Sequence, residues 1–151
     1  MIYTHTLADA IERCLRSKTW PSTGGGVTFV RTRSVRTDLT GLIGTQVSII
    51  PFGTGMTLDA EGVYEANPDI RMVVQRKLEG QDAGYDRTLA DAAAQVTEEI
   101  CAHLVGREFL GFQCQSAKPT PSYDPAKLQT LDVFDATIHT LWKAAFDGPD
   151  D

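Results

Sequence analysis

The stretch 132–146, DVFDATIHTLWKAAF, shows the clearest alternation of apolar and polar positions in the chain. Thr140 interrupts an apolar set that otherwise shares one parity: Phe134, Ala136, Ile138, Trp142, Ala144 and Phe146. Strict alternation is typical of a β-strand with one buried face, because successive side chains point to opposite faces. At roughly 3.3 Å per residue the stretch would reach roughly 45–50 Å, well beyond the usual 5–6 residues. We therefore expect a strand that is bent or longer than the core it covers.

Two other stretches have the 3–4 residue spacing of amphipathic helices. Residues 7–18 form the first, with Thr6 as a plausible N-cap. Residues 89–104 form the second, with Gly106 at the position after the helix that favours glycine.

The remaining β-prone stretches lie on either side of the second helix, at 27–35, 43–52, 70–78 and 110–115. Pro51 cannot donate to a sheet ladder, so we expect it at a strand end, an edge or a bulge. The polar connection 53–69 is either a hairpin that extends beyond the body or a mobile loop. The proline-containing segment 116–132 is expected to interrupt the strands before the last one.

This order predicts one α+β domain over residues 1–146, with a mixed or antiparallel sheet of four to five strands and two helices packed on one face. The polar positions of the strands predict that the other face meets water or a partner. Residues 147–151, DGPDD, are expected to form an acidic flexible tail.

Composition narrows the possible functions. The formal net charge of −6 argues against nonspecific binding to nucleic acid or anionic membranes, both of which favour basic surfaces. No apolar run approaches the roughly 20 residues that span a bilayer. Asp9 and Glu12 interrupt the N-terminal stretch, so we do not expect a signal peptide there. Three cysteines make a disulfide framework an unfavourable interpretation and favour thiols in a reducing interior.

The residues show no convincing catalytic or metal-binding motif. The glycine run before Val27 lacks the Lys-Ser/Thr of a phosphate loop, and the histidines lack metal-ligand spacing. A nucleophilic pair of Cys114 and His139 is conceivable on neighbouring strands, but no acidic residue is placed to orient the histidine. We therefore expect a protein that is not an enzyme and that binds no cofactor or metal.

Arg31, Arg33 and Arg36 are concentrated in six residues. They could bind an acidic protein partner, because guanidinium groups match carboxylates. Alternatively, they are the solvated charges that protect an edge strand from pairing with another chain.

The sequence of elements resembles the tail-terminator and tail-completion proteins of long-tailed bacteriophages and related gene-transfer particles. The resemblance covers most of the chain: a first helix (LADAIERCLRSK), a strand that ends in proline (VSIIPF), a paired strand (IRMVVQRKL) and a final Tyr-Asp-Pro turn that leads into the last strand (SYDPAKLQTLDVFDATIHTLW). The segments VTFVRTRSV and 53–69 are longer than a minimal member of this class would need.

The resemblance implies a non-enzymatic virion protein, assembled in the cytoplasm of a bacterial host as a homohexameric ring. Such a ring stops polymerisation of the tail tube and joins the tail to the head-neck connector. Its partners would be other copies of itself, the tail-tube protein and the connector, with genome DNA passing through without specific binding and no membrane contact. Another neck component and a small non-viral binding or dimerisation module are the alternative interpretations.

Strand edges are ready-made association surfaces, so we expect segment 53–69 and the far end of 132–146 to contact the neighbouring subunit. The side chains expected at subunit or partner contacts are Arg31, Arg33, Arg36, Met56, Leu58, Tyr64, Trp142 and Phe146.

Overall fold

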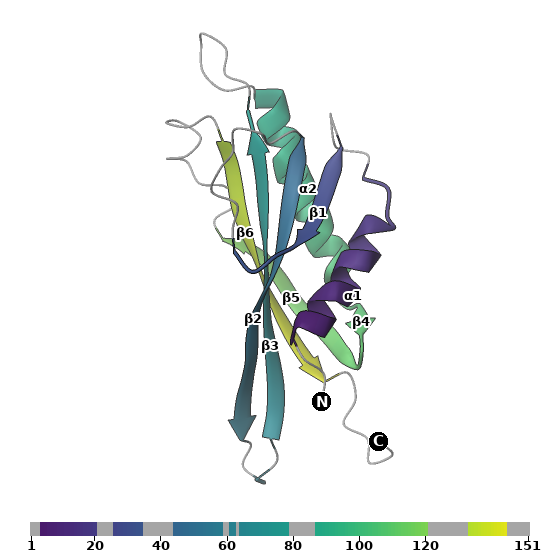
Figure 1. Cartoon of the computed structure of the whole chain (residues 1–151), viewed down its shortest axis with the longest axis vertical. Coiled ribbons are helices and arrows are strands. Elements are labelled where there is room, and N and C mark those ends of the chain that lie inside the picture. The colour runs from purple at the N-terminus through teal and green to yellow at the C-terminus, as the bar shows by residue number, and fades with distance from the viewer. Residues whose placement is uncertain are drawn as a thin grey trace.

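The computed structural model describes residues 4–20, 26–34, 44–58, 61–62, 64–78, 87–120 and 133–144 (Figure 1). Within these residues the elements are, in order, α1 (Thr4–Arg16), β1 (Val27–Arg31), β2 (Thr45–Leu58), β3 (Tyr64–Lys77), α2 (Arg87–Leu104), β4 (Glu108–Phe109), β5 (Phe112–Thr120) and β6 (Val133–Ala144). The strands form one sheet in the order β1-β2-β3-β6-β5-β4. Only the pair β1–β2 is parallel, so the sheet is mixed.

The α+β class and the mixed sheet agree with the sequence, but the described part has six strands instead of four to five. The additional strand is β4, which pairs with the start of β5 through a tight turn at Leu110 and Gly111. Both turn residues have positive φ, 53° and 85°, as a two-residue hairpin of the favoured twist requires. The prediction of a strand that starts at Leu110 is therefore wrong, because a leucine in this conformation is rare and the sequence gives no hint of it.

Strand β5 also continues through 116–120, where the sequence predicts an interruption. On that side the backbone hydrogen bonds of β5 end at Cys114, which bonds to Gly106 and Arg107. No described strand pairs with β5 beyond that point on this side, so Pro119 is tolerated.

Strand β6 lies at the centre of the sheet, between β3 and β5. Phe134, Ala136, Ile138 and Trp142 of the predicted apolar set are buried. The predicted alternation is confirmed only between Thr137 and Lys143, because Val133 and Asp135 are buried as well and Ala144 is exposed. Cross-strand registers place Ile138 beside Met72 and Ala136 beside Val74, so these side chains share one face.

Both helices pack on that face. Leu7, Ala8, Ile11 and Leu15 of α1 are fully buried. The corresponding buried stripe of α2 consists of Ala93, Val96, Ile100 and Leu104. Side chains of both helices belong to one core cluster with those of β2, β3 and β6. Helix α1 begins at Thr4, ahead of the predicted Thr6 cap, whereas the predicted Gly106 ends α2 with a φ of 86°.

The opposite face was expected to meet water or a partner, and this is wrong for the body of the sheet. Buried side chains on that face come from three adjacent strands: Ser48, Ile50, Val73, Gln75, Val133 and Asp135. The apolar residues Val73 and Val133, which break the polar parity of their strands, indicated this burial in the sequence.

The β2–β3 hairpin continues beyond the body of the sheet (Figure 1). The pairing of β1 with β2 ends at Arg31 and Ile49, and that of β3 with β6 ends at Asp69 and Leu141. Residues 53–58 of β2 and 64–69 of β3, which we call the arm, pair mainly with each other. Of the two predicted alternatives for 53–69, the extended hairpin is therefore confirmed.

Truncating Phe134 tests whether β6 is the centre of the core. Phe134→Ala should lower the free energy of unfolding by about 3–5 kcal/mol, because it leaves a cavity beneath both helices. Leu141→Ala on the same strand is the control: Leu141 is 44% exposed, so the loss should stay below about 1 kcal/mol. Chemical denaturation measures both values, and equal losses would contradict this arrangement.

Candidate interface: the arm and the cleft at its base

A β-bulge sets the orientation of the arm. The register shifts between Pro51, which pairs with Ile70, and Gly53, which pairs with Asp69. Gly53 has a φ of 137°, a conformation that essentially only glycine adopts. Pro51 thus lies beside a bulge and beyond the end of β1, as the sequence predicts.

The extra residue shifts the alternation of the arm. Thr54, Met56 and Leu58 point to the side of the sheet that carries the helices, whereas without the bulge they would point to the other side. Thr54 meets the start of α1, where its hydroxyl hydrogen-bonds the Thr4 hydroxyl. Helix α1 thus begins where the arm begins.

Beyond this contact the arm presents an uncovered apolar face. Met56 is 52% exposed and Leu58 is 60% exposed. Their cross-strand neighbours are Ala66 and Tyr64. Covering the exposed part of each of these two side chains would contribute about 1 kcal/mol.

The opposite face of the arm base carries a second, smaller patch. Phe52 is 55% exposed, and the Arg71 guanidinium carbon lies 4.1 Å from the centre of its ring. Arg71 also pairs with Asp69, with Nη2 and Oδ2 3.2 Å apart. Leu141, in register with Asp69, adds an exposed aliphatic side chain beside them.

A cleft of about 570 Å³ opens where α1, β1 and β2 meet at the base of the arm. Its walls are formed by the first turn of α1, the end of β1 with the residues after it, and the bulge: Thr4, His5, Arg31, Arg33, Pro51, Phe52, Gly53 and Thr54. We call it the basic cleft.

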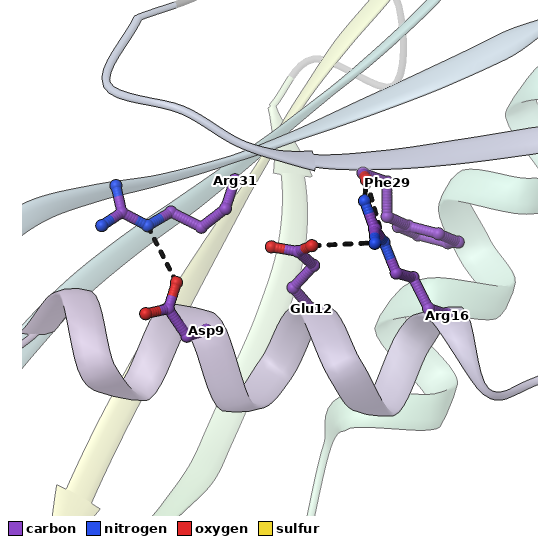
Figure 2. A network of polar contacts seen from close by, with 5 residues as sticks. All are labelled: Asp9, Glu12, Arg16, Phe29 and Arg31. Atoms are coloured by element: carbon purple, nitrogen blue, oxygen red, sulfur yellow. Dashed lines mark hydrogen bonds and ion pairs between the residues drawn. The ribbon is translucent and has the colours of Figure 1, made fainter.

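Polar contacts join α1 to β1, the two elements that form part of the basic cleft (Figure 2). The Arg31 Nε donates to Asp9 Oδ1 at 3.0 Å. The Arg16 Nη2 donates to the Phe29 carbonyl oxygen at 2.8 Å, and its Nε lies 3.2 Å from Glu12 Oε1. These contacts are partly exposed, so each is worth less than about 1 kcal/mol. Their role is to hold the edge strand β1 against α1.

The predicted arginines therefore differ in their surroundings. Arg31 is partly neutralised by Asp9, whereas Arg33 is exposed and lines the basic cleft. No carboxylate of the described segments forms an ion pair with Arg33. Arg36 lies outside the described residues.

Of the other predicted contact residues, Met56 and Leu58 share one exposed face of the arm. Tyr64 pairs with Leu58 through the backbone, and Phe146 lies outside the described residues. The prediction that Trp142 contacts a partner is wrong, because its side chain is fully buried. Its ring packs against Phe109, with the centroids 5.8 Å apart. Trp142 shares the parity of the core-facing residues, so the alternation already pointed to this burial.

The sequence does not predict four of the residues that line the basic cleft, namely Thr4, His5, Phe52 and Thr54. Only Phe52 had a signal, a large apolar side chain directly after the strand-ending Pro51. The others depend on where the start of α1 meets β2, across about fifty residues of chain.

The predicted pair of Cys114 and His139 does not form. Cys114 is buried beside Trp142 on the helix-bearing face, whereas His139 pairs with Lys118 and is exposed on the other face. Burial raises the pKa of the Cys114 thiol to about 11, and burial with the nearby Glu98 raises that of Cys101 to about 11. Both thiols are therefore protonated at neutral pH and are poor nucleophiles.

The structure instead places the Cys14 sulfur 3.6 Å from the Nε2 of His103. Arg107 Nη2 lies 3.4 Å from Nδ1 of the same ring. A guanidinium can only donate, so Nδ1 accepts and the proton of the neutral ring lies on Nε2, facing the sulfur. In this tautomer His103 cannot take a proton from Cys14 through Nε2.

No group of three or more potential metal ligands occurs among the residues that the structure describes. None of the helices described has the length and hydropathy of a membrane span. Comparisons with known protein families and with curated proteins find no match for this sequence.

The His103 environment makes a testable prediction about pH. Burial, followed by the positive charges of Arg107 and Lys18, lowers the pKa of His103 below 6.5. His103 therefore makes its full contribution to the free energy of unfolding above pH 6.5, and this contribution is lost as the pH falls through the folded-state pKa. Arg107→Gln should raise the pKa of His103 toward 6.5, as an NMR titration of the ring protons would show. Arg33→Gln, in the basic cleft, is the control and should leave this pKa unchanged. A pKa at or above 6.5 in the unmodified protein would contradict the assignment.

Proposed function

We propose that this chain is a structural virion protein that forms a ring at the head-proximal end of a phage tail. In this role it terminates polymerisation of the tail tube and joins the tail to the head-neck connector. The observation that carries the proposal is the arm: a paired hairpin that leaves the body and exposes Met56 and Leu58 on one face. The resemblance of the sequence to tail terminators supplies the biological context.

The arm is suited to contact a neighbouring copy. Among the described residues, no strand pairs with β2 beyond Ile49 on the β1 side, so the backbone of the arm has an edge that another strand could extend. A contact between the arm of one copy and a different surface of the next is heterologous, and repeated contacts of this kind close into a ring.

The apolar face of the arm is too small to form a stable contact alone. Specific interfaces bury about 800 Å² on each partner, which is more than two half-exposed side chains provide. We therefore infer that the strand edge and the patch of Phe52 and Leu141 at the arm base enlarge the contact. The surfaces for the tail-tube protein and the connector would then lie on the two ends of the ring.

The overall charge is compatible with a channel for DNA. A protein with a net charge of −6 does not attract a polyanion in general, so genome DNA could pass through such a ring without being held.

Replacing the apolar side chains of the arm tests the proposal. Met56→Ser combined with Leu58→Ser should convert rings to monomers, with the dissociation constant of each subunit contact raised at least about tenfold. Native mass spectrometry measures the change in oligomeric state. In infected cells the same variant should give particles with abnormally long tails, visible in negative-stain micrographs.

The matched control replaces two other exposed apolar residues, Val105 and Leu110, which are 48% and 45% exposed and lie away from the arm. Val105→Ser with Leu110→Ser should leave rings and tail lengths unchanged. A monomer or dimer in the unmodified protein would instead favour the small binding or dimerisation module. Rings with unaltered tail lengths in the arm variant would favour a different neck component.

A further inference from the structure

The apolar face of the arm runs directly into the basic cleft. Thr54 belongs to both, since it lines the cleft and shares its face with Met56 and Leu58. An occupant of this continuous surface would need an apolar residue for the arm and, next to it, negative charges for Arg33 and the partly neutralised Arg31.

The sequence that follows β6 has this order. Ala145 and Phe146 come first, followed by three aspartates at 147, 150 and 151. We propose that residues 145–151 dock in cis on this surface, with Phe146 on the apolar face of the arm and the aspartates in the basic cleft.

The registers place the end of β6 within reach. Leu141 pairs with Asp69, and Asp69 pairs with Gly53 of the cleft wall. Leu141 and Gly53 are therefore two strand spacings apart, about 10 Å. Strand β6 runs in the same direction as β2, because both are antiparallel to β3, and it continues three residues beyond Leu141, where its pairing with β3 ends. Seven extended residues span up to about 25 Å, enough to cross the arm and enter the cleft.

The docking depends on tethering as well as on charge. Exposed carboxylate–guanidinium contacts are individually weak and are screened by salt. A short tether, however, holds the segment near its site at an effective concentration on the order of millimolar. Docking in cis therefore requires only weak intrinsic affinity.

The docked segment would cover the surface proposed above for the subunit contact. If that proposed function holds, the segment and a neighbouring subunit compete for the arm, and docking would keep the free protein from assembling prematurely. The docking itself does not require a ring and is tested separately.

Methionine methyl groups offer a selective probe. The chain has three methionines, of which Met56 lies on the arm and Met72 is fully buried in the core. In the full-length protein with ¹³C-methyl methionine, Phe146→Ala should shift the Met56 methyl signal, because the ring current of Phe146 is lost, and should leave Met72 unchanged. Neutralising the three aspartates (D147N, D150N, D151N) should shift Met56 in the same direction, and added salt should do so in the unmodified protein.

The matched control removes three acidic charges elsewhere. D91N, E98Q and E108Q change the net charge equally at exposed positions of α2 and β4 and should leave the Met56 signal in place. A Met56 signal that stays unchanged in both the Phe146→Ala variant and the variant with the three aspartates neutralised would overturn the proposal.

A peptide of residues 144–151 then separates docking in cis from contact with another copy. It should bind the aspartate-neutralised protein about two- to tenfold more tightly than the unmodified protein, whose own segment competes. Equal affinity for the two proteins would overturn docking in cis and assign the surface to a second copy. In the neutralised background, Arg33→Gln should weaken peptide binding at least about threefold, whereas Arg13→Gln on the exposed side of α1 should not. Equal effects of the two substitutions would remove the basic cleft from the proposal.

The outcomes also distinguish this inference from the proposed function. If the protein forms rings but the Met56 signal does not respond to changes in residues 145–151, the proposed function stands and the docking is refuted. Docking in a protein that never forms rings would refute the ring and leave the cleft assignment standing.

Discussion

The ladder between β2 and β3 is the interaction on which the rest of the structure depends. Each strand has 14 residues, and the two remain paired along almost their whole length. The first half of this ladder carries β1 on one side and β6 on the other, and its helix-bearing face supports the core. The second half leaves the body as the arm. Gly53 connects the two halves, because its bulge keeps Met56 and Leu58 on the face where the helices pack and beyond the point where α1 begins. The same strands therefore provide both the core and the exposed surface.

Helix α1 determines how much of that ladder is covered. Its four buried apolar residues provide most of its attachment, because each polar contact to β1 is partly exposed and weak. The polar contacts instead fix the direction of α1 across the sheet. Arg16 donates to the Phe29 carbonyl of the edge strand, and the Thr4 hydroxyl hydrogen-bonds the Thr54 hydroxyl at the base of the arm. The basic cleft results from this placement, since the helix start, the end of β1 and the bulge meet without filling the space between them.

Local patterns predicted the elements better than their contacts. The alternation around Ile138, the helical stripes and Gly106 are signals read from neighbouring residues, and the structure confirms them. The orientation of the arm could not be predicted, because a single bulge at Gly53 reverses every side chain after it. The approach of Cys14 to His103 joins residues 89 positions apart, and no local pattern reports it. The prediction for Trp142 is wrong for a different reason: the length of the strand predicts an exposed end, whereas the parity of Trp142 places its side chain in the core.

We propose that the arm is an assembly surface rather than a hairpin that stays in solvent. Hydrogen exchange across a range of protein concentrations tests it directly, because assembly by the arm must protect the amides of residues 53–58 that point away from β3. Protection of these amides should rise as the protein assembles, while the amides of β6, already paired on both sides, should exchange equally slowly throughout. Unchanged exchange in the arm while the mass of the particle increases would show that another surface joins the subunits.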